Sequence, residues 1–215
     1  MGADLKRIAV DPVQIDAYSW PEATLLRYEV FTKFQAELQQ DLLMHLDADM
    51  MIVDDVGADL DPTTWLSGLA LVRHPGFRRP QGAQGLAFYA RHPSRAVKDS
   101  VLRLGTGGIG TWERRQASRA NVSRSNRHTY VCGGTWFGLR DPFLSMVNEL
   151  AERTRADLDE GTIAVWHDES HLNWYASTHP TTVLGSEYCY APGFPNLTDI
   201  SPRIIAVDKA DDRTR

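Results

Sequence analysis

The sequence predicts an α/β fold, because short apolar strand candidates alternate with amphipathic helix candidates along the chain. The clearest strand candidate covers residues 41–46, the clearest helix covers 141–151, and a last short strand covers 204–207. With 215 residues the chain is long enough for one sizeable core,. We therefore expect a single domain over residues 1–215.

The composition is that of an ordinary soluble globular protein, with 42% hydrophobic and 24% charged residues,. The net charge of -5, without a long cluster of Lys and Arg, gives no reason to expect a nucleic-acid partner,. No apolar run is long enough to span a bilayer, and residues 1–4 do not begin a signal peptide,. We therefore expect a cytoplasmic protein without a membrane span. Cys132 and Cys189 fit no metal spacing and no disulfide framework,.

The N-terminal part predicts a short strand at residues 8–10 and then a helix. Ser19-Trp20-Pro21-Glu22 has the pattern of a capping box with a proline in the first turn,. The helix is expected to run to about Gln39, with one apolar face made by Ala23, Leu26, Val30 and Phe34,. Arg27 lies beside this face, where the helix alone would make it a surface residue.

The apolar residues 41–46 are interpreted as a buried strand of the kind found in parallel sheets,. Asp47-Ala48-Asp49 follows directly, and residues two apart in an extended chain point the same way. Both carboxylates could therefore bind one hard cation, Mg²⁺ or Mn²⁺, which would neutralise the phosphates of a nucleotide. Short acidic pairs are also common in turns, but ligands of open α/β sheets bind at the carboxyl ends of strands.

Residues 65–72 form another apolar segment, and His74-Pro75-Gly76-Phe77 predicts a turn after it,. Residues 78–86 and 103–110 are rich in Gly, Gln and Arg and are predicted to be loops. The second contains Gly105-Thr106-Gly107-Gly108-Ile109-Gly110, which has neither the preceding strand nor the Lys of a phosphate-binding loop,. We interpret it as a flexible surface loop.

Residues 130–138 predict a strand that Gly133 and Gly134 interrupt, either for close approach of a ligand or backbone or as a β-bulge,. Asp141 and Pro142 are expected to cap the next helix, and Gly161 lies past its end,. The buried side of the helix that begins at Asp141 and Pro142 is expected to contain Leu144, Val147, Leu150 and Ala151. Val183 and Leu184 are a further strand candidate.

The densest group of acid/base residues is Trp166-His167-Asp168-Glu169-Ser170-His171-Leu172-Asn173. Asp168 is a good N-cap, which would place Glu169 in the first helical turn, where the helix dipole favours a negative charge. The segment suits catalysis or ligand binding, or is an ordinary capped helix. His167 and His171 also suggest a zinc hydrolase, but Glu169 is one position later than the Glu of His-Glu-x-x-His.

Several of these pieces, in this order, resemble glycosyltransferase family 6, which includes the histo-blood group A and B transferases, the α-1,3-galactosyltransferase and shorter bacterial relatives. The most specific match is Val165 to Asn173, and the resemblance extends from about Tyr18 to the C-terminus. The supporting matches are Asp47-Ala48-Asp49-Met50, His74-Pro75-Gly76-Phe77, Glu113-Arg114-Arg115, Gly133-Gly134 and Ser186-Glu187-Tyr188.

The resemblance implies a Rossmann-like GT-A fold with a mixed central sheet, and a retaining enzyme that uses a UDP-sugar. Asp47 and Asp49 match the Asp-x-Asp motif, so we expect them to bind Mn²⁺, with Mg²⁺ as the alternative, on the donor diphosphate. Arg27 and Asp168 match donor-binding residues, and Lys209 and Arg213 resemble basic tail residues that close over the diphosphate. Cys132, Gly133 and Gly134 match the segment beside the donor's C2 substituent, where small residues favour UDP-GalNAc over UDP-galactose.

His74, Trp166 and Glu169 match residues around the acceptor galactose, so a galactose-containing oligosaccharide is the expected acceptor. Glu169 is the expected catalytic residue. It acts either as a nucleophile that forms a glycosyl-enzyme or as a carboxylate that stabilises an oxocarbenium-like state. The expected reaction is α-1,3 transfer of GalNAc or galactose.

Two departures from the family pattern affect this expectation. The family's first strand, which holds the uracil ring, has no evident match in residues 1–17, so we expect a GT-A domain without that strand. Ala191 stands where the mammalian enzymes have an acceptor-contacting Asp. A degenerate homologue that binds a nucleotide or sugar without turnover is therefore the alternative.

Overall fold

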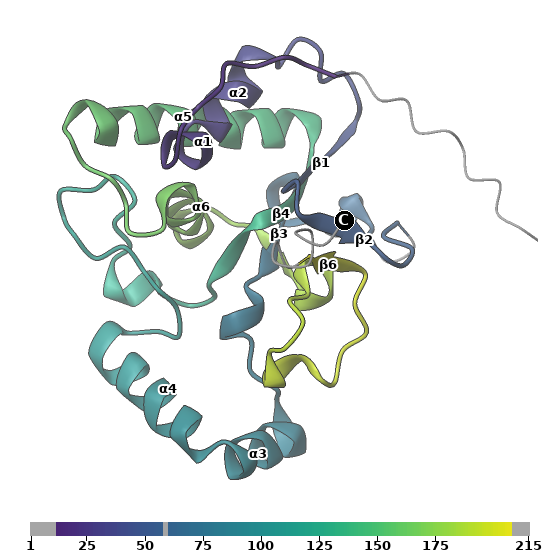
Figure 1. The fold of residues 1–215 in the computed structure, drawn as a ribbon, viewed down its shortest axis with the longest axis vertical. Coiled ribbons are helices and arrows are strands. Elements are labelled where there is room, and N and C mark those ends of the chain that lie inside the picture. The colour runs from purple at the N-terminus through teal and green to yellow at the C-terminus, as the bar shows by residue number, and fades with distance from the viewer. Residues whose placement is uncertain (1–11, 58–59, 208–215) are drawn as a thin grey trace, which may run out of the picture.

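The structure is a computed structural model that describes residues 12–57 and 60–207. Its main sheet is mixed, with the strand order β1-β4-β3-β5 (Figure 1). Strand β4 pairs antiparallel with β1 and β3, and β3 pairs parallel with β5. The sheet strands are β1 (Leu42–Leu46), β3 (Leu69–Arg73), β4 (Val131–Leu139) and β5 (Thr182–Leu184).

A second, two-stranded sheet joins distant parts of the chain. Strand β2 (Met50–Ile52) pairs antiparallel with β6 (Ile204–Ala206), next to the end of β1. This pairing brings the C-terminal segment beside the Asp47-Ala48-Asp49 turn, because Val207 N donates to Asp49 O at 2.7 Å. The predicted α/β class and mixed central sheet are confirmed.

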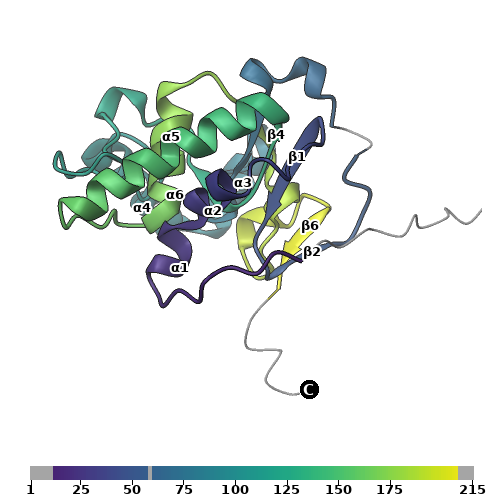
Figure 2. The same cartoon turned by 90° about the horizontal axis from the view of Figure 1, so that it is seen from above.

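Helices cover one face of the main sheet. Helix α5 (Arg140–Asp159) runs beside α2 (Arg27–Lys33) and packs on α6 (His167–Thr178), as Figures 1 and 2 show. The short helix α1 (Glu22–Leu25) precedes α2. Fully buried side chains between these helices and the sheet include Tyr28, Leu71, Trp136, Leu150 and Leu172. The opposite face is covered by the segment around Tyr188, Cys189 and Ile204.

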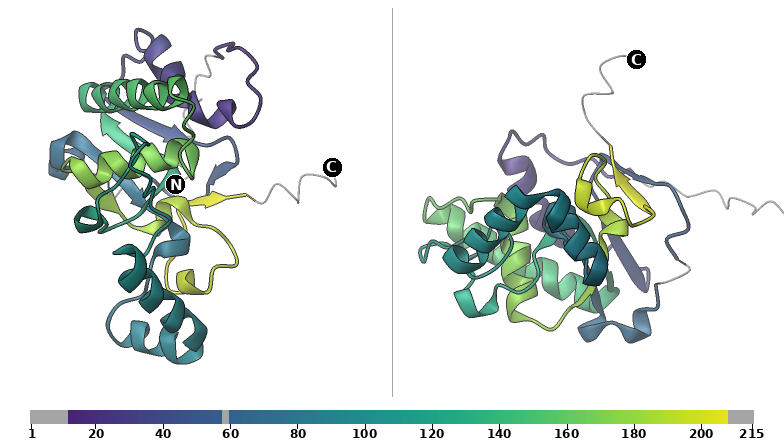
Figure 3. Two further views of the ribbon diagram at one scale, coloured as in Figure 1. Left: turned by 90° about the vertical axis from the view of Figure 1, so that its left-hand side faces the viewer. Right: turned by 90° about the horizontal axis from the view of Figure 1, so that it is seen from below.

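The segment after β3 contains two helices that the sequence did not predict. Helices α3 (Gly82–Arg91) and α4 (Pro93–Thr106) form a hairpin at one end of the molecule, away from the sheet (Figures 1 and 3). The prediction of loops at residues 78–86 and 103–110 was therefore wrong for residues 82–86 and 103–106, which are helical. Gly105 and Thr106 complete α4, and its C-cap Gly107 has φ 88°. Val97, Val101 and Leu104 of α4 recur at helical spacing, but these apolar side chains are exposed and do not face the core,.

Three other predictions need correction. The helix expected to reach Gln39 is two short helices that end at Lys33, and their buried side chains are Leu25, Leu26 and Tyr28. Strand β1 is an antiparallel edge strand with Leu42 and Met44 exposed, because its outer edge has no neighbour. Asp141 does not cap α5 and instead pairs with Arg140.

The predicted face of α5 is confirmed, since Leu144, Val147, Leu150 and Ala151 are all buried. The strand at residues 8–10 lies outside the described residues, and residues 12–17 have no regular secondary structure. No helix within 12–57 or 60–207 is both long and apolar enough to cross a membrane.

Replacing the buried Leu172 by Ala should lower the free energy of unfolding by about 2–5 kcal/mol, because the cavity is left in a packed core,. The control Leu104→Ala changes the same residue type at a position that is 77% exposed. It should change the free energy of unfolding by less than about 0.5 kcal/mol. Urea unfolding curves measure both. Equal destabilisation by the two variants would contradict this core assignment.

Candidate functional site

A cavity of about 420 Å³ lies where the end of β1, the glycine pair of β4 and the start of α6 meet. It is lined by Arg27, Asp47, His74, Phe77, Thr111, Gly133, Gly134, Trp166, His167, Asp168 and Glu169. Helix α2, the end of β1 and the start of α6 are far apart in the sequence and place four charged side chains around this one space.

Arg27 connects two carboxylates across this cavity. Its Nη1 donates to Asp47 Oδ1 at 2.8 Å and to Gly133 O at 3.3 Å, and its Nε lies 3.1 Å from Asp168 Oδ2. Burial disfavours the charge on Arg27, but Asp168 and Asp47 outweigh this effect and raise its pKa. Arg27 is thus a fixed cation that joins the end of β1 to the start of α6.

Glu169 is held against the glycine pair. Gly133 N donates to Glu169 Oε2 at 2.9 Å. A Cβ added at Gly133 would lie 3.3 Å from Asp168 Oδ2 and 3.4 Å from Glu169 Cβ, which is a tight contact. The pairing of β3 with β4 also shifts register between Leu71 and Arg73, opposite these glycines. The irregular pairing supports the β-bulge interpretation, and the close approach at Gly133 is made by the side chains of Asp168 and Glu169 and not by a ligand or another backbone.

Asn173 fixes α6 to β4 one turn after Glu169. Its side-chain amide donates to Val131 O at 2.8 Å and to Glu169 O at 2.9 Å, and its Oδ1 accepts from Val131 N at 2.8 Å. Asn173 is 1% exposed, and its side chain supplies the hydrogen bonds that the buried backbone groups of Val131 and Glu169 need in the absence of water,. Asn173 therefore positions the start of α6 over the strand.

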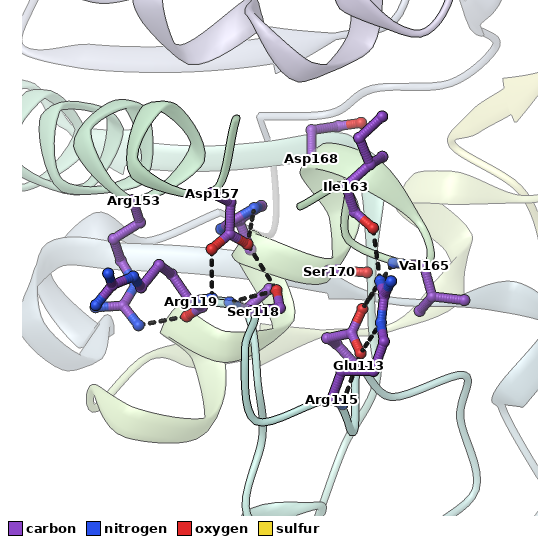
Figure 4. A network of polar contacts seen from close by, with 12 residues as sticks. Glu113, Arg115, Ser118, Arg119, Arg153, Asp157, Ile163, Val165, Asp168 and Ser170 are labelled. Atoms are coloured by element: carbon purple, nitrogen blue, oxygen red, sulfur yellow. Dashed lines mark hydrogen bonds and ion pairs between the residues drawn. The ribbon is translucent and has the colours of Figure 1, made fainter. Parts of the chain in front are cut away.

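A second network holds the segment before α6. The carboxylate of Glu113 accepts from Val165 N at 2.8 Å, from Arg115 Nη2 at 2.6 Å and from two backbone amides (Figure 4). Although burial opposes its charge, these donors lower the pKa of Glu113 to about 2. Beside it, Asp157 on α5 accepts from Ser118 Oγ and Arg119 N (Figure 4). Glu113 thus stays ionised and keeps Val165 next to the cavity.

Burial makes the two carboxyls at the start of α6 weaker acids. It raises the pKa of Asp168 to about 6, although the charge of Arg27 opposes the shift. It raises the pKa of Glu169 to about 7, although the Gly133 N–H and the nearby Tyr130 hydroxyl favour the ionised form. Glu169 is therefore close to half ionised near neutral pH.

His74 is a neutral donor in this cavity. Burial lowers the pKa of His74 to about 4. Its Nδ1 accepts from Gly76 N at 3.0 Å, so the single ring proton is on Nε2,. The predicted turn at Pro75 and Gly76 is thereby confirmed, and it sets the tautomer that His74 presents.

The structure brings together eight of the predicted site residues. They are Arg27, Asp47, His74, Gly133, Gly134, Trp166, Asp168 and Glu169. Cys132 is buried behind the cavity, and Asp49 does not line it. Lys209 and Arg213 lie outside the described residues. The N-cap of α6 is Trp166 and not Asp168, because the helix starts at His167, two residues before Glu169.

Sequence reasoning missed three residues that shape the site. His45 Nε2 lies 3.1 Å from Arg27 Nη1 and 3.2 Å from Asp47 Oδ1. The Tyr28 hydroxyl donates to Asp168 O at 3.0 Å. For His45 the strand period of two was a usable signal, because His45 and Asp47 are alternate residues. Nothing in the sequence distinguishes Tyr28 from an ordinary core residue, and Asn173, although part of the Val165–Asn173 match, was given no role there.

The Asp-x-Asp segment is a turn and not an extended chain. Met50 N donates to Asp47 O at 3.0 Å, so the argument that strand geometry aligns Asp47 with Asp49 was wrong. Among the described residues no three His, Cys, Asp or Glu side chains gather as a metal site. The donor set still fits Mn²⁺ or Mg²⁺, which bind through one or two carboxylates completed by phosphate oxygens and water.

The zinc alternative finds no support in the placement of its two histidines. His167 lines the cavity, whereas His171 is fully buried with Nε2 3.6 Å from Asp157 Oδ2. Burial lowers the pKa of His171 to about 4, although Asp157 opposes this shift. The two imidazoles thus face different surroundings and do not share one open coordination site.

Glu169→Gln should stabilise the fold increasingly as the pH rises from 5 to 8. Between pH 4.5 and about 7 an unfolded chain has lost the Glu169 proton while the folded chain keeps it, so wild-type stability falls over this range,. The shift corresponds to roughly 3 kcal/mol at most. Chemical unfolding of both proteins at pH 5 and pH 8 measures it. Glu152→Gln, on the exposed side of α5, is the control, and a Glu169→Gln difference independent of pH would contradict the assignment.

The residue pattern of this cavity agrees with comparisons of the whole chain. The profile of glycosyltransferase family 6 matches residues 108–215, about half of the chain. Histo-blood group ABO system transferase 1 of Rattus norvegicus is 30% identical over 197 residues, which cover 88% of this chain and 48% of that protein.

Two further relatives extend the comparison to a bacterial protein and to another vertebrate enzyme. The O-antigen biosynthesis glycosyltransferase WbnI of Escherichia coli is 25% identical over 205 residues, covering 95% of this chain and 75% of that protein. Globoside alpha-1,3-N-acetylgalactosaminyltransferase 1 of Gallus gallus is 27% identical over 205 residues, covering 93% and 51%. This chain spans about half the length of the vertebrate relatives it matches. The chain belongs to glycosyltransferase family 6.

Proposed function

We propose that this protein is a retaining glycosyltransferase with a GT-A fold that transfers GalNAc, or galactose, from a UDP-sugar. The acceptor is proposed to be a galactose-containing glycan, and the new linkage α-1,3. The observation that carries the proposal is the buried Glu169, held by Gly133 in a cavity that also contains Arg27, Asp47 and Asp168. Family membership and the activities named for the relatives support the reaction type.

The proposed donor occupies the side of the cavity formed by Arg27, Asp47 and the glycine pair. GalNAc is proposed as the donor sugar because Cys132, Gly133 and Gly134 resemble the family's segment beside the donor's C2 substituent, although the space next to both glycines is taken by Asp47, Asp168 and Glu169. Asp168 and the Arg27 cation are placed to orient the hydroxyls of the transferred sugar. Because a Cβ at Gly134 would lie 3.3 Å from Asp47 Oδ2, that carboxylate faces the strand and the proposed sugar site.

In the proposed reaction the bond between the anomeric carbon and the diphosphate breaks, and its electron pair leaves with UDP. The ionised Glu169 either attacks the anomeric carbon to form a glycosyl-enzyme or stabilises positive charge there while the acceptor hydroxyl attacks. The acceptor proton leaves with the UDP or to solvent. His74, through Nε2–H, and Trp166, which is 51% exposed, are proposed to position the acceptor galactose.

Asp47 and Asp49 are proposed to hold Mn²⁺ or Mg²⁺ together with the diphosphate. Such a cation would offset the charge that develops on departing UDP. The ion pair of Arg27 with Asp47 keeps one carboxylate ionised, because His45 and Arg27 outweigh burial and lower the pKa of Asp47. Lys209 and Arg213 are proposed to contact the same diphosphate.

Release of UDP from UDP-GalNAc and UDP-galactose tests this proposal. Wild-type protein should release UDP, and Glu169→Gln should be at least about 100-fold slower because charge stabilisation at the reacting carbon is lost. Glu152→Gln should behave like the wild type. Binding of UDP without release from either donor would instead support the non-catalytic nucleotide- or sugar-binding homologue.

Removal of divalent cations should stop UDP release if Asp47 and Asp49 act through a metal. EDTA should abolish the reaction, and added Mn²⁺ should restore it. Asp49→Asn should raise the Mn²⁺ concentration needed for half-maximal rate, since one ligand charge is lost. The control Asp54→Asn makes the same change in the exposed loop after β2. Full activity in EDTA would rule out the metal role.

A further inference from the structure

A second cavity, of about 520 Å³, lies beside the proposed reaction site and contains four arginines. We call it the arginine pocket and define it by Arg73, Arg79, Arg103 and Arg127, with His128 at its edge. It lies between the end of β3, the α3–α4 hairpin and the segment before β4. None of these arginines has a role in the sugar transfer proposed above.

Only part of the positive charge of the arginine pocket is balanced by a carboxylate, that of Asp99, which pairs with Arg79 and also interacts electrostatically with Arg103. Arg79 is paired with the buried Asp99, its Nη2 2.7 Å from Oδ1. Arg127 donates to the backbone carbonyls of Val122 and Thr106, which do not neutralise it. The side chains of Arg73 and Arg103 make no hydrogen bond or ion pair with any residue that the structure describes. Three positive charges thus share a pocket whose lining contains no acid among the described residues.

The same imbalance extends over the surrounding segment. Residues 78–127 contain eleven Lys and Arg but only two Asp and Glu, in a chain whose net charge is -5. Both acids are buried and paired, Asp99 with Arg79 and Glu113 with Arg115. A cleft lined by one sign of charge concentrates ions of the opposite sign. The segment therefore favours an anionic ligand.

The glycine-rich turn after α4 forms part of this pocket. Gly107 and Gly108 line it, and a Cβ at Gly108 would collide with Arg127 O, so the close approach requires glycine. The last carbonyls of α4 would repel an anion, but Arg124 donates to Leu104 O and Arg127 donates to Thr106 O. The turn that the sequence analysis assigned to a flexible surface loop thus helps to build a basic pocket.

Phe77 lines both the reaction cavity and the arginine pocket. Tyr130 stands beside it, with ring centroids 5.0 Å apart, and forms part of the pocket wall. Phe77 is therefore a wall that the two cavities share. The pocket is lined by Arg73 and Phe77, which flank the turn that begins at His74, and by no residue of β2 or of the Asp-x-Asp turn where the donor diphosphate is proposed.

We propose that the arginine pocket binds a phosphate or carboxylate group of the acceptor, so that the preferred acceptor is an anionic glycan. This inference rests on the proposed transferase function. The guanidinium groups of Arg73 and Arg103 supply the free donors for the anion. Arg127 supplies a fixed charge.

Direct binding tests the pocket without any turnover. Inorganic phosphate and D-glucuronate are titrated into the protein by calorimetry, and Arg73→Gln and Arg103→Gln are compared with Lys98→Gln. Lys98 is an exposed cation on the same helix as Arg103 and lies outside the pocket. Each pocket variant should bind at least about tenfold more weakly, and the control should not change. Thermal unfolding confirms that all variants fold. Equal binding by all four proteins would overturn the proposal.

Kinetics with matched acceptors then connect the pocket to acceptor choice. A neutral galactoside is compared with galactosides that carry a phosphate or a carboxylate. The charged acceptor with the lower KM identifies the anion that the pocket prefers. Arg103→Gln should raise the KM of the anionic acceptor about tenfold, with the neutral acceptor and the UDP-sugar KM unchanged. A rise in the UDP-sugar KM instead would overturn the inference. If no UDP is released at all, the proposed transferase function fails, while the binding titration still reports on the pocket.

Discussion

The ion pairs of Arg27 are the constraint on which the site depends. One guanidinium contacts Asp47 at the end of β1, Asp168 at the start of α6, and the carbonyl of Gly133 in β4. Removing either carboxylate would leave a buried cation partly unpaired, which is more costly than leaving out the pair altogether. Arg27 therefore fixes the geometry of three elements that are distant in the sequence, and only with that geometry fixed does Glu169 reach the amide of Gly133.

The burial of Glu169 lowers the stability of the fold, although the proposed reaction depends on this buried carboxylate. Burial makes Glu169 a weak acid, and its ionised form, which the reaction needs, is the form that costs folding free energy,. Asn173, Glu113 and the packing of α5 against α6 offset this cost by holding α6 from the other side. A glycine at position 133 is part of the arrangement, because a side chain there would press against Asp168 and Glu169.

Much of the fold and site could be predicted from the sequence, but only where the signal is local. The strand before Asp47, the apolar face of α5 and the residue types of the Trp166–Asn173 stretch are local patterns, and each was found. The hairpin α3–α4 was missed although Val97, Val101 and Leu104 recur at helical spacing, because the glycines and arginines at its two ends were taken as signs of loops. Strand β1 was assigned to the interior because an edge strand can be as apolar as a central one. The contacts of Tyr28 and Asn173 depend on partners more than 40 residues away, which no local pattern records.

The most direct test of the central claim is the configuration of the first-formed product. Proton NMR of the reaction of an α-linked UDP-sugar with a galactoside acceptor gives the anomeric coupling of the new linkage. If the carboxylate of Glu169 acts on the anomeric carbon as proposed, the product is α-linked. A β-linked product would contradict the account, because it would mean a single displacement in which the acceptor attacks from the side assigned to Glu169.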